Sequence, residues 1–294
     1  MDMIFSICSA SIELGAIYSI VVIGLALSFR IVNFIDLTIE SSFTTGAAIT
    51  AVALNYNMSS VISLFFAFFC GAISGFITAT LHVKFKINKL LSGIIMLTVL
   101  YSINLRIMGK SNFPLFDFVC IFDNNSQAIR NLILIFILLL IFSVLCCFLK
   151  TSFGFFLRAT GENSGIVTKH GKDTGLFIIT GLMLSNALTA FSGALAAQNQ
   201  GFSDIGMGNG LIITSVAALV IGETVLPPTN IPRLILSAVI GSFMYQMIIA
   251  IGLRLGINPW DLKIATGILL ALSVIVKKEI NKDNSNLNIG SESL

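Results

Sequence analysis

The segment KTSFGFFLRATGENSGIVTKHGKDT, Lys150 to Thr174, is the longest polar stretch between two long apolar runs of this chain. Within it, Glu162 to His170 reads as one short helical piece, with Asn163 or Ser164 placed to cap its start and Gly171 to end it. A helix of two turns is not stable alone. The segment therefore predicts a short helix that is held between two membrane spans and exposed to a soluble partner.

The composition is that of a membrane protein. Of the 294 residues, 56% are hydrophobic and 11% are charged, whereas about 25% are charged in ordinary soluble domains. Since a span needs about 20 residues, the chain has room for about eight to ten helices in an all-α, polytopic transmembrane bundle with no soluble domain. We expect residues 1–280 to form the membrane domain and residues 281–294, rich in Asn, Ser and Glu, to be a disordered cytoplasmic tail.

Nine apolar runs are candidate spans. They are Ser11 to Phe29, Leu37 to Leu54, Val61 to Leu81, Leu90 to Met108, Asn131 to Leu149, Leu176 to Ala197, Gly210 to Val225, Arg233 to Leu255 and Leu262 to Val276. Polar residues or Gly interrupt the second and the seventh at one end, so each is a candidate for a broken or partly re-entrant helix. On the third span, Gly71 and Gly75 form a G-x-x-x-G face that predicts close packing of two helices.

The positions of Lys and Arg predict the orientation, because cytoplasmic loops carry an excess of them. With the Lys150 to Thr174 segment in the cytoplasm, alternation of the spans puts twelve of the seventeen inside: Arg30, Lys84, Lys86, Lys89, Lys150, Arg158, Lys169, Lys172, Arg233, Lys277, Lys278 and Lys282. The chain is thus expected to be a multi-pass protein of the bacterial inner membrane, with its N-terminus outside and its C-terminus in the cytoplasm. The net charge of +3 gives no reason to expect nucleic-acid binding.

Several stretches carry a family resemblance. The run LRATGEN, followed by a short helical segment and a Gly, resembles the cytoplasmic coupling loop of ABC importer permeases of the branched-chain amino acid and ribose class. Other stretches look like one poorly characterised subfamily, whose members include permeases linked to uptake of aromatic amino acids. They are NFIDLTIESSF (Asn33 to Phe43), LYSINLRIMGKSNFPL (Leu100 to Leu115), LSNALTAFSGALAAQNQGFSDIGMG (Leu184 to Gly208), VIGE (Val220 to Glu223) and INPWDLK (Ile257 to Lys263).

This resemblance implies a permease subunit of a binding-protein-dependent importer for an amino acid or a similar small polar solute. Its implied partners are a separate ABC ATPase, an extracytoplasmic binding protein and a second permease copy, in a homodimer or close heterodimer. The chain itself has no G-x-x-x-x-G-K-[ST] motif, so it is not expected to be an enzyme. The residues expected to couple it to the ATPase are Arg158, Thr160, Gly161, Glu162, Asn163, Ile166, Val167, His170 and Gly171.

Polar residues in the spans are candidates for lining a translocation path: Asp36, Glu40, Asn104, Asn186 and Gln198. Asp36 and Glu40 are four residues apart, so they are expected to share one helix face at the start of the second span. Arg30 and the helix N-terminus are close enough to compensate their charge. For the carboxylates the alternative is a structural role in ion pairing, and for the amides it is hydrogen bonding between helices.

A self-sufficient secondary transporter is the rival interpretation, with Asp36, Glu40 or Glu223 as a proton or cation site. It leaves the basic segment between two spans without a purpose. The five cysteines and two histidines show no metal-ligand spacing, so packing roles are expected and no metal or cofactor. The run GMGNG, Gly206 to Gly210, lacks the spacing of a nucleotide loop and is expected to be a bend that opens the seventh span.

Overall fold

The computed structural model describes residues 2–123 and 126–256, and isolated positions between 258 and 271. Within these ranges the chain forms helices α1 (Asp2–Ala26), α2 (Thr38–Asn55), α3 (Ser60–Val83), α4 (Lys89–Met108), α5 (Gln127–Lys150), α6 (Ser152–Glu162), α7 (Ser164–Lys169), α8 (Thr174–Gln200), α9 (Leu211–Val225) and α10 (Ile231–Arg254), with a π-helical turn η1 (Leu27–Ile31) and strands β1 (Asn112–Pro114) and β2 (Phe202–Asp204). The predicted tail and most of the ninth predicted span lie outside the described residues.

The described part of the chain is an all-α membrane bundle, as predicted. Six helices are long and apolar enough to cross a membrane: α1 with η1, α3, α4, α5, α8 and α10. The second and seventh predicted spans differ from the other six. Helix α2 has 18 residues but is too polar to meet the same criterion, and α9 has only 15 residues. These are the two positions at which the sequence indicates a broken or partly re-entrant helix, and α9 is the shorter of the two helices.

Helix α2 occupies the centre of one half of the bundle. It packs against α8, α3 and α4, and its buried residues include hydroxyl side chains such as Ser42, Thr44 and Thr45. The Thr45 hydroxyl donates to the carbonyl of Ser41 at 2.8 Å. Because protein surrounds α2 on several sides, its polar side chains find protein partners instead of facing hydrocarbon. This explains why a membrane helix here is less apolar than its neighbours.

Glycines allow the central helices to come into backbone contact. A Cβ added at Gly193 of α8 would lie 1.9 Å from the carbonyl oxygen of Phe43 in α2, and one at Gly46 of α2 would lie 1.8 Å from that of Ala190. On α3, a Cβ at Gly71 or Gly75 would lie 2.4 or 2.3 Å from carbonyl oxygens of α8. The predicted packing role of the Gly71 and Gly75 face is confirmed, since small residues let membrane helices approach closely.

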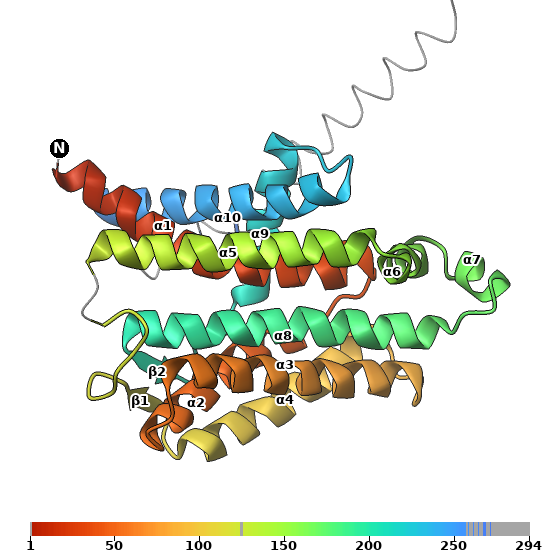
Figure 1. The fold of residues 1–294 in the computed structure, drawn as a ribbon, viewed down its shortest axis with the longest axis horizontal. Coiled ribbons are helices and arrows are strands. Elements are labelled where there is room, and N and C mark those ends of the chain that lie inside the picture. Colours follow the sequence, from red (N-terminus) through yellow and green to blue (C-terminus); the bar gives the residue numbers. More distant parts are fainter. Residues whose placement is uncertain are drawn as a thin grey trace, which may run out of the picture.

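The two ends of the bundle carry different structures (Figure 1). Helices α6 and α7 project at one end, and β1 and β2 lie at the opposite end, on the side where the chain begins. The strands pair antiparallel, with Phe113 opposite Ser203, and thereby join the α4–α5 connection to the α8–α9 connection. Cys120 is buried in this strand-bearing end, where burial and the neighbouring Asp123 raise the pKa of its thiol to about 11. A thiol of this kind is protonated and inert, as expected for packing.

The contact between α2 and α8 makes a testable prediction. We expect Gly193→Ala to destabilise the protein by about 1–3 kcal/mol or more, because overpacking at a backbone contact forces the two helices apart. Thermal unfolding of the purified protein in mild detergent measures the effect. Gly165→Ala is the matched control, since the nearest atom to its added Cβ is the Asn163 side-chain oxygen at 3.1 Å. Equal stability of the two variants would contradict the prediction.

Candidate functional site

The polar segment that interrupts the apolar sequence forms two helices, α6 and α7, instead of one piece. Glu162 is the last residue of α6. Asn163 has an extended backbone and separates α6 from α7. The Asn163 side chain caps α7, because its Oδ1 accepts a hydrogen bond from the amide of Gly165 at 3.0 Å. Gly171 follows with φ of 67°, a left-handed conformation that suits Gly. The predicted cap and stop are confirmed, whereas the predicted start at Glu162 is wrong.

Burial divides the predicted coupling residues into two groups. Thr160 and Val167 are buried, and Gly161 lies so close to η1 that an added Cβ would be 2.0 Å from the carbonyl oxygen of Ile31. Ile166, by contrast, is 44% exposed, and the exposed positions also include Glu162, Asn163, His170 and Gly171. The first group holds the segment on the bundle, and the second forms its free surface. Arg158, half-buried on α6, belongs to neither.

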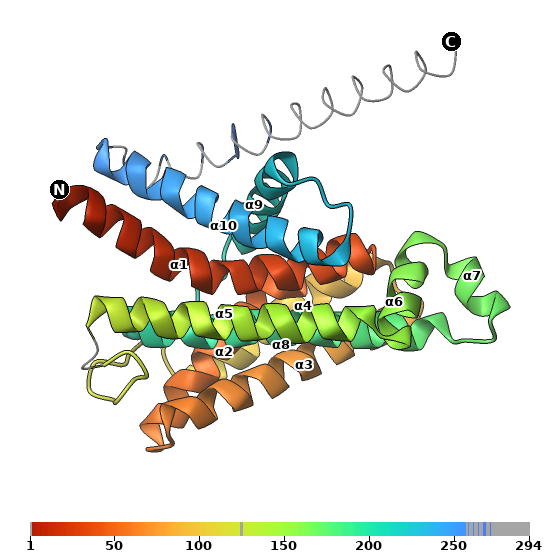
Figure 2. The same cartoon turned by 45° about the horizontal axis from the view of Figure 1, so that its top comes forward.

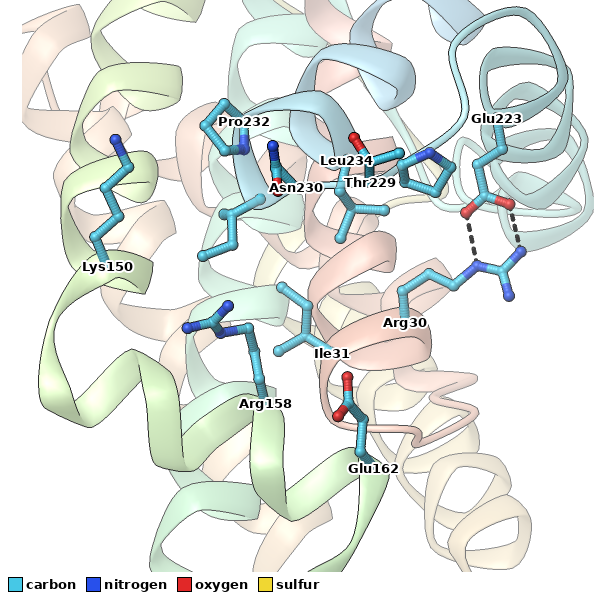
Figure 3. Close-up of a pocket in the computed structure, with 12 residues that line it drawn as sticks. Arg30, Ile31, Lys150, Arg158, Glu162, Glu223, Thr229, Asn230, Pro232 and Leu234 are labelled. Atoms are coloured by element: carbon cyan, nitrogen blue, oxygen red, sulfur yellow. Dashed lines mark hydrogen bonds and ion pairs between the residues drawn. The ribbon is translucent and has the colours of Figure 1, made fainter.

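A cavity of about 650 Å³ lies beside α6 at this end of the bundle (Figure 3). Its walls are formed by the ends of η1, α5, α6 and α9 and by the start of α10. The lining residues are Arg30, Ile31, Lys150, Arg158, Glu162, Glu223, Pro228, Thr229, Asn230, Ile231, Pro232 and Leu234. The cavity therefore places the coupling segment next to the link between α9 and α10.

Arg30 and Glu223 form a bidentate ion pair on the cavity wall. The Nε of Arg30 donates to Oε1 of Glu223 at 2.7 Å, and its second guanidinium nitrogen donates to Oε2 at 2.5 Å. The Glu223 side chain is fully buried, whereas that of Arg30 is 35% exposed. The pair joins the π-helical turn after α1 to the end of α9. Arg30 therefore compensates Glu223, and the expectation that it compensates Asp36 and Glu40 is not met.

Asp36 lies before α2, in the connection from η1. Its Oδ1 accepts from the amide of Thr38 at 2.9 Å, and its Oδ2 accepts from the side-chain amide of Asn186 at 2.6 Å. Asn186 is near the middle of α8, and its Oδ1 accepts from the hydroxyl of Ser42 at 2.7 Å. That hydroxyl also lies 2.7 Å from Ser74 of α3. Asp36 and Asn186 thus form a buried network that ties three helices together, which favours their structural interpretation.

Glu40 is in the first turn of α2 and faces the start of α9. Its Oε1 accepts hydrogen bonds from the amides of Gly210 at 3.1 Å and Ile212 at 3.3 Å. A carboxylate is stabilised at this position, because helix N-termini present free N–H groups and a positive dipole end. Gly210 has φ of 84° and begins the helix, so the predicted bend at GMGNG is confirmed. Asp36 and Glu40 do not share a helix face, and the prediction that they do is wrong.

Asn104 of α4 lies beside Glu40. Its side-chain nitrogen donates to the carbonyl of Ser41 at 3.2 Å, whereas its buried Oδ1 has no hydrogen-bond partner among the described residues. A small cavity of about 30 Å³ adjoins both side chains, and Tyr101 and Asn209 also line it. The structure therefore brings two of the five predicted path residues to one polar cavity.

Gln198 lies apart from the other path candidates. Its Oε1 accepts from the amide of Ile121 at 3.2 Å, and its side-chain nitrogen donates to the Ser60 carbonyl and the Ser63 hydroxyl at 3.1 Å each. These bonds fasten the connection after α4 and the start of α3 to the end of α8. The role that this geometry supports for Gln198 is anchoring the strand-bearing end.

One group of exposed polar side chains on α4 was not predicted from the sequence. Thr98, Ser102 and Arg106 of α4 are exposed and line one shallow groove with Val99 and Ile103. They are spaced four residues apart, so they form one polar stripe along a helix that is long enough to cross the membrane. The i, i+4, i+8 spacing was the signal that could have identified this stripe.

The fold and these interior polar groups define a multi-pass membrane transport component. The sequence profile of the family described as branched-chain amino acid transport system, permease component, matches residues 7–276. The chain belongs to this family. Its six apolar helices and this membership make it a multi-pass inner-membrane protein, and a transport component rather than a catalyst.

Individual relatives agree with the family. The chain is 40% identical over 255 residues to a tyrosine transport system permease protein of Clostridioides difficile, covering 86% of this chain and 85% of the relative. It is 26% identical over 250 residues to an autoinducer 2 import system permease protein of Yersinia pseudotuberculosis, covering 82% of this chain and 68% of the relative. No solved structure gave a significant match.

The second prediction concerns the ion pair between Arg30 and Glu223. We expect Arg30→Gln to destabilise the protein by about 3–5 kcal/mol, because the buried Glu223 carboxylate would lose its charged partner. Glu223→Gln should cost less, since it removes the buried charge itself. Thermal unfolding in detergent compares the two variants, and Lys84→Gln, at an exposed position, is the control. A larger loss of stability for Glu223→Gln than for Arg30→Gln would refute this account.

Proposed function

We propose that this chain is the membrane-spanning permease subunit of a binding-protein-dependent ABC importer, and that a separate ATPase docks on α6 and α7. The proposal rests on the position of α7 and on the exposure of its apolar side chain at Ile166. Helix α7 is a six-residue helix at one end of the bundle, with Ile166 exposed on the outside and Val167 buried beneath it. An exposed apolar side chain on such a helix suits a partner's groove. Glu162, Asn163, His170 and Gly171 surround this contact.

A continuous set of contacts leads from this docking surface to the membrane interior. Gly161 of α6 touches η1 at Ile31, and η1 carries Arg30, which is bonded to Glu223 near the end of α9. The other end of α9 rests on Glu40. ATP binding in the partner would shift the equilibrium between inward-open and outward-open states through different contacts on α6 and α7 in each state. Helix α9 is the element that would carry the change.

We place the translocation path on the face formed by α4 and by the meeting point of α2 and α9. Support comes from the stripe of Thr98, Ser102 and Arg106, because exposed polar side chains on a membrane helix are costly against lipid. Glu40 and Asn104 line a separate small cavity on the buried side of α4, together with Tyr101. A second copy of the chain would cover this face, and the solute would pass between the two copies.

The strand-bearing end would face outwards and receive the binding protein. Its exposed apolar side chains include Phe116, which is 78% exposed, and Val119, which is 79% exposed, with the exposed Asp117 between them. Insertion of these side chains among lipid headgroups is the competing role for the same loop. In this orientation α1 begins outside, and α6 and α7 lie in the cytoplasm.

The proposed solute is an amino acid or a similar small polar molecule. The name of the tyrosine transport relative supports this class. So do the carboxylate of Glu40 and the amide oxygen of Asn104, which has no partner within the described ranges, since both oxygens suit an ammonium group. The family membership disfavours the rival interpretation of a secondary transporter. Glu223, one of its candidate proton or cation sites, is already paired with Arg30.

Docking is tested with charge and shape changes on α7. We expect Ile166→Asp combined with Lys169→Glu to abolish co-purification of an ABC ATPase with the tagged chain from host membranes, because the exposed apolar contact would become acidic. Mass spectrometry identifies the ATPase by peptides that contain its Walker A motif. Lys84→Glu combined with Lys86→Glu is the control at other exposed positions on the same side of the predicted topology. Retention of the ATPase by the α7 variant, inserted at wild-type levels, would refute docking at α7.

Cross-linking tests whether a second copy of the chain covers the α4 face. In a variant whose native cysteines are replaced by Ala, we expect Ser102→Cys to give a covalent dimer in native membranes on mild oxidation, because the two α4 stripes would face each other. Val144→Cys, exposed on α5, should remain monomeric. Dimers from Val144→Cys with none from Ser102→Cys would place the interface on the other side of the bundle.

A further inference from the structure

The cavity beside α6 has a net positive charge, because three cations and two carboxylates line it. Among its five charged lining residues, Arg30 and Glu223 neutralise each other. Lys150 and Arg158 have no carboxylate within ion-pair distance in the described part of the chain. Glu162 is one helical turn from Arg158, but the Arg158 guanidinium points away from it, towards the side of the cavity where Lys150 lies (Figure 3). Two cations are therefore available to one bound anion.

The first turn of α10 adds further donors to the same wall. Asn230 is the N-cap residue of α10, but its side chain makes no capping hydrogen bond. The first N–H groups of a helix lack intrahelical acceptors. Pro232 has no N–H, so this helix end offers the N–H groups of Ile231 and Arg233 and the side-chain amide of Asn230. Helix N-termini favour phosphate and other anions. Lys150, Arg158 and the start of α10 thus converge from three different elements.

The rest of the cavity wall is apolar, and the site lies where α5 ends. Ile31, Ile231, Pro232 and Leu234 supply hydrocarbon surface beside the cations. Helix α5 is the span least covered by protein, with only 22% of its apolar window buried, and Lys150 is its last residue. Figure 2 shows α5 and α10 running along the same side of the bundle with α1 between them. A ligand in this cavity would combine a negative headgroup with an apolar tail alongside α5.

We propose that this cavity binds the phosphate headgroup of an anionic phospholipid from the cytoplasmic leaflet. Lys150 and Arg158 contact the phosphate, Arg158 with the paired donors that suit its oxygens, and Asn230 and the α10 N-terminus complete the site. Basic pockets between membrane helices on the cytoplasmic side are suited to such headgroups. The bound lipid would hold α5 and α6 against the α9–α10 link, so membrane composition would influence the docking end of the protein.

The experiment measures binding of phosphatidylglycerol and of phosphatidylcholine to the delipidated full-length chain in detergent by native mass spectrometry. It needs neither ATPase nor transported solute, so its outcome is separate from that of the proposed transport function. We expect phosphatidylglycerol to bind preferentially, and its affinity to fall by roughly tenfold or more in K150Q/R158Q, since both cationic contacts to the phosphate are removed. K84Q/K86Q, with the same change of charge at exposed positions away from the cavity, should bind as wild type does.

Further arms separate the lipid from other occupants. Arg158→Lys should keep most of the binding, and thermal unfolding without lipid shows whether each variant is folded. Equal binding of the two lipids, or undiminished phosphatidylglycerol binding by K150Q/R158Q, overturns the proposal. So does stabilisation by soluble glycerol 3-phosphate that equals that by the lipid, which would assign the site to a soluble phosphate ester. Loss of the ATPase from K150Q/R158Q with lipid binding intact would assign it to the protein interface.

Discussion

The structure depends on how two helices begin inside a membrane bundle. Backbone N–H groups at a helix start must be satisfied within the protein where water is absent. Asp36 accepts from the amide of Thr38 at the start of α2, and Glu40 accepts from the first amides of α9. Each carboxylate gains favourable hydrogen bonds, and each helix start gains an acceptor. This exchange lets α2 and α9 begin within the bundle, and it places polar groups at the centre of the proposed route.

Helix α9 links the centre of the protein to the end at which docking is proposed. Helix α9 has one end on Glu40 and the other on Arg30, through Glu223. Arg30 lies on the π-helical turn that Gly161 of α6 touches through Ile31. Because buried ion pairs and backbone contacts have few alternative geometries, a displacement of α6 would be transmitted to α9 in the proposed mechanism. The helices proposed for docking are thus connected to the polar interior by direct contacts, despite their distance along the chain.

Much of the fold could be predicted because apolar length and turn chemistry are local properties. Six spans, the Asn163 cap, the Gly171 stop and the bend at GMGNG follow from residues adjacent in sequence. The candidate site was less predictable. Proximity within the chain suggested that Arg30 serves Asp36 and Glu40, yet its partner is 193 residues away. Likewise, Val167 and Ile166 are neighbours with the same character, and only packing buries one and exposes the other.

The sequence by itself determined an all-α membrane protein, its topology-forming apolar runs and the position of its polar projecting segment. Each of these depends on the transfer of consecutive side chains and their backbone between water and hydrocarbon. The tertiary structure alone decided that α2 lies at the centre of the bundle with its polar side chains buried, that Gln198 anchors one end, and that Lys150, Arg158 and the start of α10 share a cavity. Those outcomes depend on which distant groups satisfy a buried donor or charge, and local sequence carries no information about distance in space.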